Sequence, residues 1–275
     1  MKTIRWIIQA ANYAEKDKQQ LQQACAQLGL PCIEIPVIPF AKELPPFPLD
    51  EQHENIYYGS TTMMDRLYQQ YNQPLGLFYD ATTFSMENYL QQWGGYMLSS
   101  EAQFMTFEEF NQAGFPAQQQ FFIRPDADSK AFAGVVLEYG KIQEWYDNLS
   151  KEDTYGLTPQ TKIMVGPAYH IEKEWRNYIV EGKVITSSTY QKNFKLYQSA
   201  TDIPASMLAF VEARCQEYQP HAVFAMDIAK CSGEEEYYII ECGCMNSVGF
   251  YAADIKKYVE ALSAYVNRQV NGQQL

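Results

Sequence analysis

The chain has 275 residues and a formal net charge of −12 at pH 7, and 47% of its residues are hydrophobic. This length allows one large domain or two to three lobes with buried cores, and the apolar content excludes a disordered chain. The acidic balance argues against nonspecific binding to nucleic acid or to an anionic membrane. No apolar run is long enough to cross a bilayer, and the first residues lack the pattern of a cleavable signal. A cytoplasmic location is therefore expected.

The first hundred residues alternate between strand and helix patterns. Residues 3–10 form an apolar run typical of a buried strand, and residues 15–29 carry apolar side chains at helical spacing. The prolines within residues 32–40 indicate a strand at the edge of a sheet. Residues 54–71 repeat the pattern of a strand followed by a helix. These repeats predict an N-terminal α/β domain over residues 1–100.

Residues 101–275 are predicted to form a second unit with two subdomains. The first, about residues 119–166, holds a strand that ends at Arg124, where Pro125 stops the pairing. A loop follows that carries Lys130 and closes on Gly134. The second subdomain, about residues 167–275, is predicted to contain a sheet and to finish in an amphipathic helix.

A β-hairpin is predicted over residues 174–190, with its turn at Glu181 and Gly182. Successive side chains of a strand point to opposite faces of a sheet. Glu174 and Arg176 therefore belong to one face of the first strand. The Glu-x-Arg pattern thus places a negative and a positive side chain side by side on that face.

A second hairpin is predicted within residues 221–254, where two apolar runs flank a polar turn centred near Glu234. Asp227 and Glu241 are equally far from that centre, so they are expected to face each other across the two strands. Two such carboxylates repel each other and lose hydration. A divalent cation relieves both penalties, and Mg²⁺ prefers carboxylates together with substrate phosphates. The alternative is a solvated pair on an open sheet face.

Six cysteines are few for this length, so reduced thiols are expected rather than a disulfide framework. Cys242 and Cys244 are predicted to share the strand face opposite Glu241, and with Cys231 they raise a zinc hypothesis. No second cysteine pair stands at zinc-finger spacing. Packing in the core is therefore the preferred role.

The order of these parts is informative. A cation ends a strand before a glycine-containing loop, the Glu-x-Arg hairpin follows, and the hairpin with two acids comes last. Phosphoryl transfer needs cations on the phosphates, carboxylates to hold Mg²⁺ and a lid that excludes water. Taken singly, each residue has a structural alternative: Arg124, for example, could pair weakly with Asp126 or Asp128. Taken together, they favour a nucleotide site.

Three segments resemble the ATP-grasp superfamily, and specifically a branch in which arginine replaces the usual phosphate-binding lysine. They are FFIRPDADSKAFAG, EWRNYIVEGKVI, and MDIAK followed by YYIIECGCMNSVGFYAAD. The resemblance covers residues 121–254 well, and the first hundred residues fit loosely as the α/β domain that precedes the grasp. It implies an ATP-grasp fold of the α/β class (α+β lobes) with an N-terminal pre-grasp domain.

The resemblance also assigns roles to residues of the nucleotide site. Arg124 matches the cation that contacts the α- and β-phosphates. Lys130 and Gly134 match a mobile loop that covers the phosphates. Glu174 matches an acid near the ribose or the metal, and Arg176 matches a residue that touches the acceptor or the acyl phosphate.

For the metal, the resemblance implies that Asp227 and Glu241 are the two Mg²⁺ carboxylates. The family usually has asparagine two places after that glutamate, whereas this chain has Gly243. Asn246, which matches the family's downstream Asn-x-x-Gly-Phe-Tyr element, is taken as the substitute ligand. This departure puts one metal site in doubt.

By resemblance, the chain is expected to be an enzyme that uses ATP and Mg²⁺ to join a carboxylate to an amine or similar nucleophile through an acyl phosphate. Its substrates would be small molecules or peptides, and the oligomeric state is left open. Charge reversal at Asp227 is expected to abolish turnover and to leave the fold intact. Alternatives are a nucleotide-binding module without ligase activity, for which Gly243 is the sign, an interaction protein that docks by aromatic side chains, or a kinase-like transfer to a hydroxyl.

Overall fold

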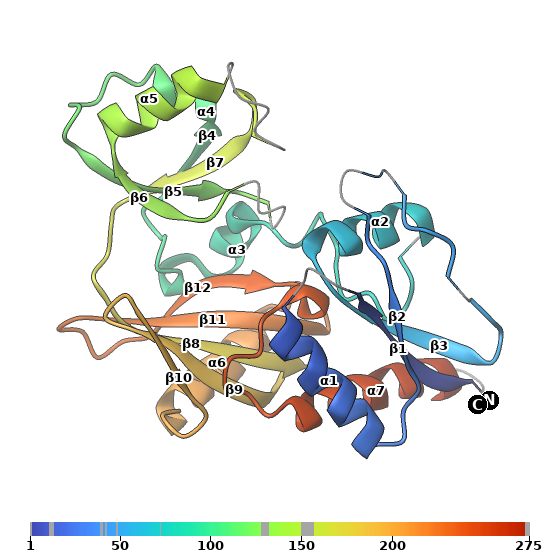
Figure 1. The fold of residues 1–275 in the computed structure, drawn as a ribbon. Coiled ribbons are helices and arrows are strands. Elements are labelled where there is room, and N and C mark those ends of the chain that lie inside the picture. The colour runs from blue at the N-terminus through green and yellow to red at the C-terminus, as the bar shows by residue number, and fades with distance from the viewer. Residues whose placement is uncertain are drawn as a thin grey trace.

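Three β-sheets organise the chain in the computed structural model shown in Figure 1. The structure describes residues 2–10, 14–38, 41, 43–47, 49–71, 73–127, 132–149 and 157–272. Within these ranges, no helix combines the length and the apolar character needed to cross a membrane. The combination of parallel and antiparallel sheets with helices confirms the predicted α/β class.

The N-terminal sheet is parallel, with the strand order β2-β1-β3. Its elements are β1 (Thr3–Gln9), α1 (Glu15–Gln27), β2 (Cys32–Ile35), β3 (His53–Tyr58) and α2 (Thr61–Tyr71). Side chains of β1 alternate between two cores: Trp6 and Ile8 face the core that includes α1, whereas Ile7 faces the core that includes α2. β2 lies at the edge of the sheet, as predicted, but it ends at Ile35, before the prolines of residues 32–40.

The second sheet is antiparallel, with the order β4-β7-β5-β6. Its elements are β4 (Gln103–Thr106), α4 (Phe107–Asn111), β5 (Gln120–Pro125), β6 (Val135–Glu138), α5 (Tyr139–Leu149) and β7 (Lys162–Gly166). Aromatic side chains of α4 and α5 share a core with this sheet. The prediction that Pro125 stops pairing holds on one side only. Pro125 lies opposite Ile163 of β7, whereas the register with β6 ends at Ile123.

The third sheet is antiparallel and has the order β10-β9-β8-β11-β12. Its strands are β8 (Ile171–Val180), β9 (Lys183–Lys192), β10 (Lys195–Ser199), β11 (Val223–Cys231) and β12 (Tyr238–Gly243). Glu181 and Gly182 have φ angles of 50° and 75°. This is the type I′ geometry that two-residue hairpin turns favour, so the predicted hairpin is confirmed.

Helices cover both faces of the third sheet. On one face lie α3 (Met86–Trp93) and α6 (Ala205–Glu217), and on the other lies α7 (Ile255–Asn271). Two short 3-10 turns, η1 (Gly94–Tyr96) and η2 (Met245–Ser247), complete the described elements. In Figure 1, α7 runs between the third sheet and the N-terminal sheet. Its side chains join both sheets into one hydrophobic core.

Candidate active site

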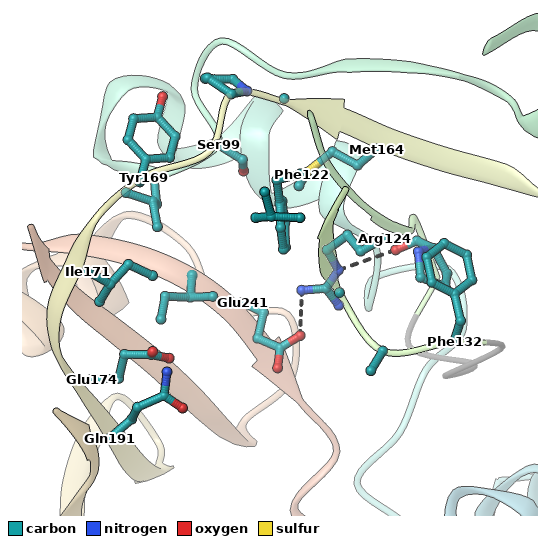
Figure 2. A pocket seen from close by; sticks show the side chains of 18 of the residues that line it. Ser99, Phe122, Arg124, Phe132, Met164, Tyr169, Ile171, Glu174, Gln191 and Glu241 are labelled. Atoms are coloured by element: carbon teal, nitrogen blue, oxygen red, sulfur yellow. Dashed lines mark hydrogen bonds and ion pairs between the residues drawn. The ribbon is translucent and has the colours of Figure 1, made fainter. Parts of the chain in front are cut away.

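A cavity of about 490 Å³ lies where the second and third sheets face each other. One wall comes from β5, β6 and β7, and the other comes from β8, β9 and β12, as Figure 2 shows. Most of the lining is apolar. The side chains that line it include Leu98, Phe122, Arg124, Met164, Tyr169, Ile171, Glu174, Tyr190, Gln191, Ile240 and Glu241. Charged groups therefore gather at one part of an otherwise apolar space.

The acid pair of the last hairpin has the predicted register. Asp227 of β11 lies directly opposite Glu241 of β12, so the expectation that they face each other is confirmed. On its other side Asp227 lies opposite Arg176 of β8. Side chains at paired positions share one face of a sheet, so Arg176, Asp227 and Glu241 form a row across three strands.

Each carboxylate of the pair has an arginine partner. The Nε and Nη2 atoms of Arg176 donate to Oδ1 and Oδ2 of Asp227 at 2.8 and 2.7 Å. The Nη1 atom of Arg124 lies 2.5 Å from Oε2 of Glu241. In the structure two guanidinium groups therefore balance the charges of the pair, and the binding of Mg²⁺ by these carboxylates stays a prediction. Asp126 and Asp128 are the alternative partners that the sequence offers for Arg124. Asp126 instead accepts from the backbone N–H of Glu87, and Asp128 lies outside the described residues.

Glu174 joins this cluster through a tyrosine that sequence reasoning missed. The hydroxyl of Tyr190 donates to Oε2 of Glu174 at 2.6 Å and lies 3.3 Å from Oδ2 of Asp227. Burial raises the pKa of Glu174, and the charges of Asp227 and Glu241 raise it further. The site is therefore rich in negative charge despite its two arginines.

Gly134 lies in the cavity wall, directly before β6. A Cβ atom there would lie 2.8 Å from the ring of Phe122, closer than real side chains approach. A side chain at position 134 would thus displace the Phe122 ring, which also lines the cavity. Lys130, the other predicted residue of this loop, lies outside the described residues.

Asn246 has a different role from the predicted metal ligand. Its side chain is fully buried. The amide nitrogen donates to the carbonyl oxygens of Tyr57 and Gly76, and the amide oxygen accepts from the N–H of Phe78. These bonds tie the segment after β12 to the N-terminal sheet. They occupy the amide group, so the prediction that it replaces the missing asparagine as a ligand is corrected.

The cysteines near the site pack in cores. Cys242 belongs to the core under α3 and α6, whereas Cys244 belongs to the core with α2. The expectation that they share a strand face is wrong, because β12 ends at Gly243. Across the described part of the chain, no three histidine, cysteine or acidic side chains converge as a ready-made metal site.

Comparison with protein families identifies the chain. The model described as "ATP-grasp domain, R2K clade family 2" matches residues 101–261, which is more than half of the sequence. The chain belongs to the ATP-grasp superfamily. A search of curated protein sequences found no match.

Solved structures of other ATP-grasp proteins share the fold. The D-cycloserine synthetase DcsG superposes with a TM-score of 0.64 at 10% identity, and the alignment covers 96% of this chain and 99% of that one. The ATP-grasp ligase PsnB, complexed with a precursor variant, Mg and ADP, gives 0.56 at 11% identity with 97% and 99% covered. D-alanine–D-alanine ligase from Bacillus anthracis, complexed with ATP, gives 0.55 at 11% identity, and both chains are fully covered.

These comparisons confirm the predicted ATP-grasp fold. Membership of the superfamily supports an ATP-dependent ligase in general terms. The substitution of arginine for a phosphate-binding lysine at Arg124 stays a prediction, as do the domain boundaries at residues 100 and 166.

Proposed function

We propose that this ATP-grasp protein is an ATP-dependent ligase that activates a carboxylate as an acyl phosphate and joins it to an amine or a similar nucleophile. The observation that carries the proposal is the grouping of Arg124, Glu174 and Glu241 in one apolar cavity between two sheets. Such a cavity suits a nucleotide, because its apolar part can enclose a base and its charged part can hold phosphates. Phe122, Met164, Ile171 and Ile240 supply the apolar part.

The acidic residues fit Mg²⁺ by charge and by donor type. Glu174, Asp227 and Glu241 face two guanidinium groups, so one negative charge remains uncompensated when all three acids are ionised. Mg²⁺ binds one or two carboxylates together with substrate phosphates. Glu241, whose side chain is 29% exposed, is the accessible ligand, whereas Asp227 is 4% exposed behind it. When bound, the ion would neutralise charge on the phosphates during transfer.

The arginines provide the remaining electrostatic roles. On nucleotide binding, Arg124 exchanges the Glu241 carboxylate for phosphate oxygens, which it can bind with the same planar donor group. Asp227 holds Nε and Nη2 of Arg176, and Nη1 takes no part in these two bonds. Arg176 would orient the acyl phosphate and stabilise the oxyanion that forms when the amine attacks. Both residues are mostly buried, so water screens their charges little.

The test is nucleotide-dependent chemistry in the intact chain. Mg·ATP should raise the melting temperature, and ADP should be released in the presence of the correct carboxylate and amine from a panel of amino acids and peptides. Hydroxylamine in place of the amine should give a hydroxamate, and an ¹⁸O-labelled carboxylate should transfer one label to phosphate. Arg124→Gln should lose these activities, whereas Arg268→Gln, at an exposed ion pair with Glu181, should keep them. Phosphate that carries no label would overturn the acyl-phosphate step.

One rival is a nucleotide-binding module without ligase activity. Gly243 stands where the family has a metal-binding asparagine, and the buried bonds of Asn246 prevent it from replacing that ligand. Tight binding of Mg·ATP without ADP release across the whole panel would favour this rival.

A further inference from the structure

Two tyrosine rings meet at the guanidinium group of Arg176. Its Cζ atom lies 5.6 Å from the ring centroid of Tyr190 and 5.3 Å from that of Tyr251. The two rings stack on each other with centroids 4.9 Å apart and planes tilted by only 14°. Asp227 holds the same guanidinium through two hydrogen bonds. Arg176 is thereby fixed both by a carboxylate and by an aromatic pair.

Both tyrosines lie at positions where the backbone departs from regular geometry. In the pairing of β8 with β9, Glu174 lies opposite Gln191 and Trp175 lies opposite Thr189, so Tyr190 is the extra residue of a β-bulge. A bulge redirects a side chain and is common beside active sites. Tyr251 has a φ angle of 55°, a left-handed conformation that is strained for a bulky residue. Such strain persists where the surrounding structure enforces it, and it clusters at functional sites.

We propose that Tyr190 and Tyr251 are positioning residues for Arg176. This inference rests on the proposed function: the two rings hold Arg176 for phosphoryl transfer and for the attack of the amine on the acyl phosphate. A cation beside an aromatic face is attracted by the ring quadrupole, and the stacked pair also limits the rotamers open to the arginine. The hydroxyl of Tyr190 adds a link between Glu174 and Asp227. Tyr251 acts through its ring, and Tyr190 acts through both its ring and its hydroxyl.

The experiment reads the arginine directly. In protein labelled with ¹⁵N-arginine, the Nε–Hε resonance of Arg176 is assigned by its loss in Arg176→Lys. The Hε proton should exchange slowly with water in the wild type and in Tyr251→Phe. In Tyr251→Leu that exchange should become fast. Tyr251→Gly is the second variant, because glycine adopts the left-handed conformation without strain and therefore preserves the backbone while removing the ring. In Tyr251→Gly the Hε proton of Arg176 should exchange with water as fast as in Tyr251→Leu.

Kinetics give a second readout once an acceptor is found. Loss of the Tyr251 ring should lower kcat by about 10- to 100-fold, the usual effect of a misplaced catalytic group, while KM for ATP stays within about twofold. Tyr190→Phe keeps a ring but loses the hydroxyl that links Glu174 and Asp227. Because Asp227 then loses one of its hydrogen-bond partners, kcat of this variant should also fall.

Slow exchange and unchanged kcat in folded Tyr251→Gly would overturn the proposal, as would an unchanged kcat in Tyr190→Phe. Urea unfolding of each variant establishes that it is folded before its resonance is interpreted. Failure of the wild type to bind Mg·ATP or to form ADP would contradict the proposed function instead. The NMR comparison needs neither ligand, so the two failures are distinguishable.

Discussion

Arg124 of β5 and Glu241 of β12 form an ion pair that joins the two sheets around the cavity, with Nη1 and Oε2 2.5 Å apart. Both residues are proposed ligands, one for phosphate and the other for Mg²⁺. In the structure each is the other's partner, as the dashed line in Figure 2 shows. Nucleotide and metal therefore have to replace a contact that the protein makes with itself.

This ion pair predicts that Mg²⁺ and ATP assist each other's binding. ATP without metal brings negative phosphates to Glu241, and metal without ATP approaches the cation of Arg124, so each alone meets repulsion. Coupling of about 5- to 150-fold is the usual range for such linked sites. Calorimetric titration of ATP with and without Mg²⁺ measures it. Glu241→Gln should bind metal-free ATP more tightly and lose most of the Mg²⁺ dependence. Glu235→Gln, in an exposed turn, is the matched control, and an unchanged Mg²⁺ dependence in Glu241→Gln would contradict the assignment.

Asp227→Asn should destabilise the fold as well as stop turnover. The substitution leaves the guanidinium of Arg176 buried without its countercharge, which typically costs about 3–5 kcal/mol. This replaces the expectation that charge reversal at Asp227 leaves the fold intact, because reversal would bury two cations together. Urea unfolding checks the loss. The double variant with Arg176→Gln should recover part of it, whereas Glu181→Gln, at an exposed pair, should change stability by less than about 1 kcal/mol. Wild-type stability for Asp227→Asn would show that the pair contributes little.

Glu174→Gln should stabilise the ligand-free protein at alkaline pH. Because the pKa of Glu174 is raised in the fold, its ionised form is penalised above the pKa of the unfolded chain. That penalty disappears as the pH falls below this value, about 4.3 for glutamate. A gain of about 1 kcal/mol corresponds to roughly 2–4 °C for a chain of this size. The difference in melting temperature from the wild type should be largest near pH 8 and should shrink toward pH 4. A difference that grows on acidification has the wrong sign for this explanation.

Gly134→Ala should weaken nucleotide binding by narrowing the cavity. The new methyl group would lie 2.8 Å from the ring of Phe122. We expect the ring to move into the cavity that it lines. We expect a loss of about tenfold in ATP affinity, in line with the cost of an overpacked site. Phe122→Leu in the same chain should restore part of the affinity by making room. If Gly134→Ala binds ATP as the wild type does, the ring moves away from the nucleotide.

Asn246→Ala should lower stability without changing Mg²⁺ affinity. It leaves three buried backbone groups, of Tyr57, Gly76 and Phe78, without their side-chain partner. Each such group typically costs about 1–3 kcal/mol. Urea unfolding measures the loss, and titration of Mg²⁺ in the presence of ATP measures the metal. A weaker metal affinity in a stably folded variant would return Asn246 to the role of a ligand.

Local patterns account for what the sequence predicted well. The turn at Glu181 and Gly182 sets the register of one hairpin. In the other, Asp227 lies opposite Glu241 as its spacing predicts, although a register shift follows directly at Ile228. The two hairpins themselves follow from turn chemistry and from alternation along a strand, which act over a few residues.

Contacts between distant segments could not be predicted in this way. The pairing of Arg124 with Glu241 depends on how two sheets face each other, and that of Arg176 with Asp227 depends on β8 lying beside β11. A bulge at Tyr190 breaks the strict alternation from which faces are inferred. For Asn246, the motif resembled a ligand, whereas the fold uses the same amide to bind backbone.

The first strand of the chain reaches its final environment only through the last helix. The indole nitrogen of Trp6 donates to the hydroxyl of Ser263 in α7 at 3.1 Å, and both lie in the core that α7 shares with two sheets. A ribosome synthesises Trp6 long before Ser263, so β1 lacks this cover until α7 has been made. Apolar surface that is exposed transiently in this way is prone to aggregation, and burying the apolar face of β1 depends on the arrival of α7.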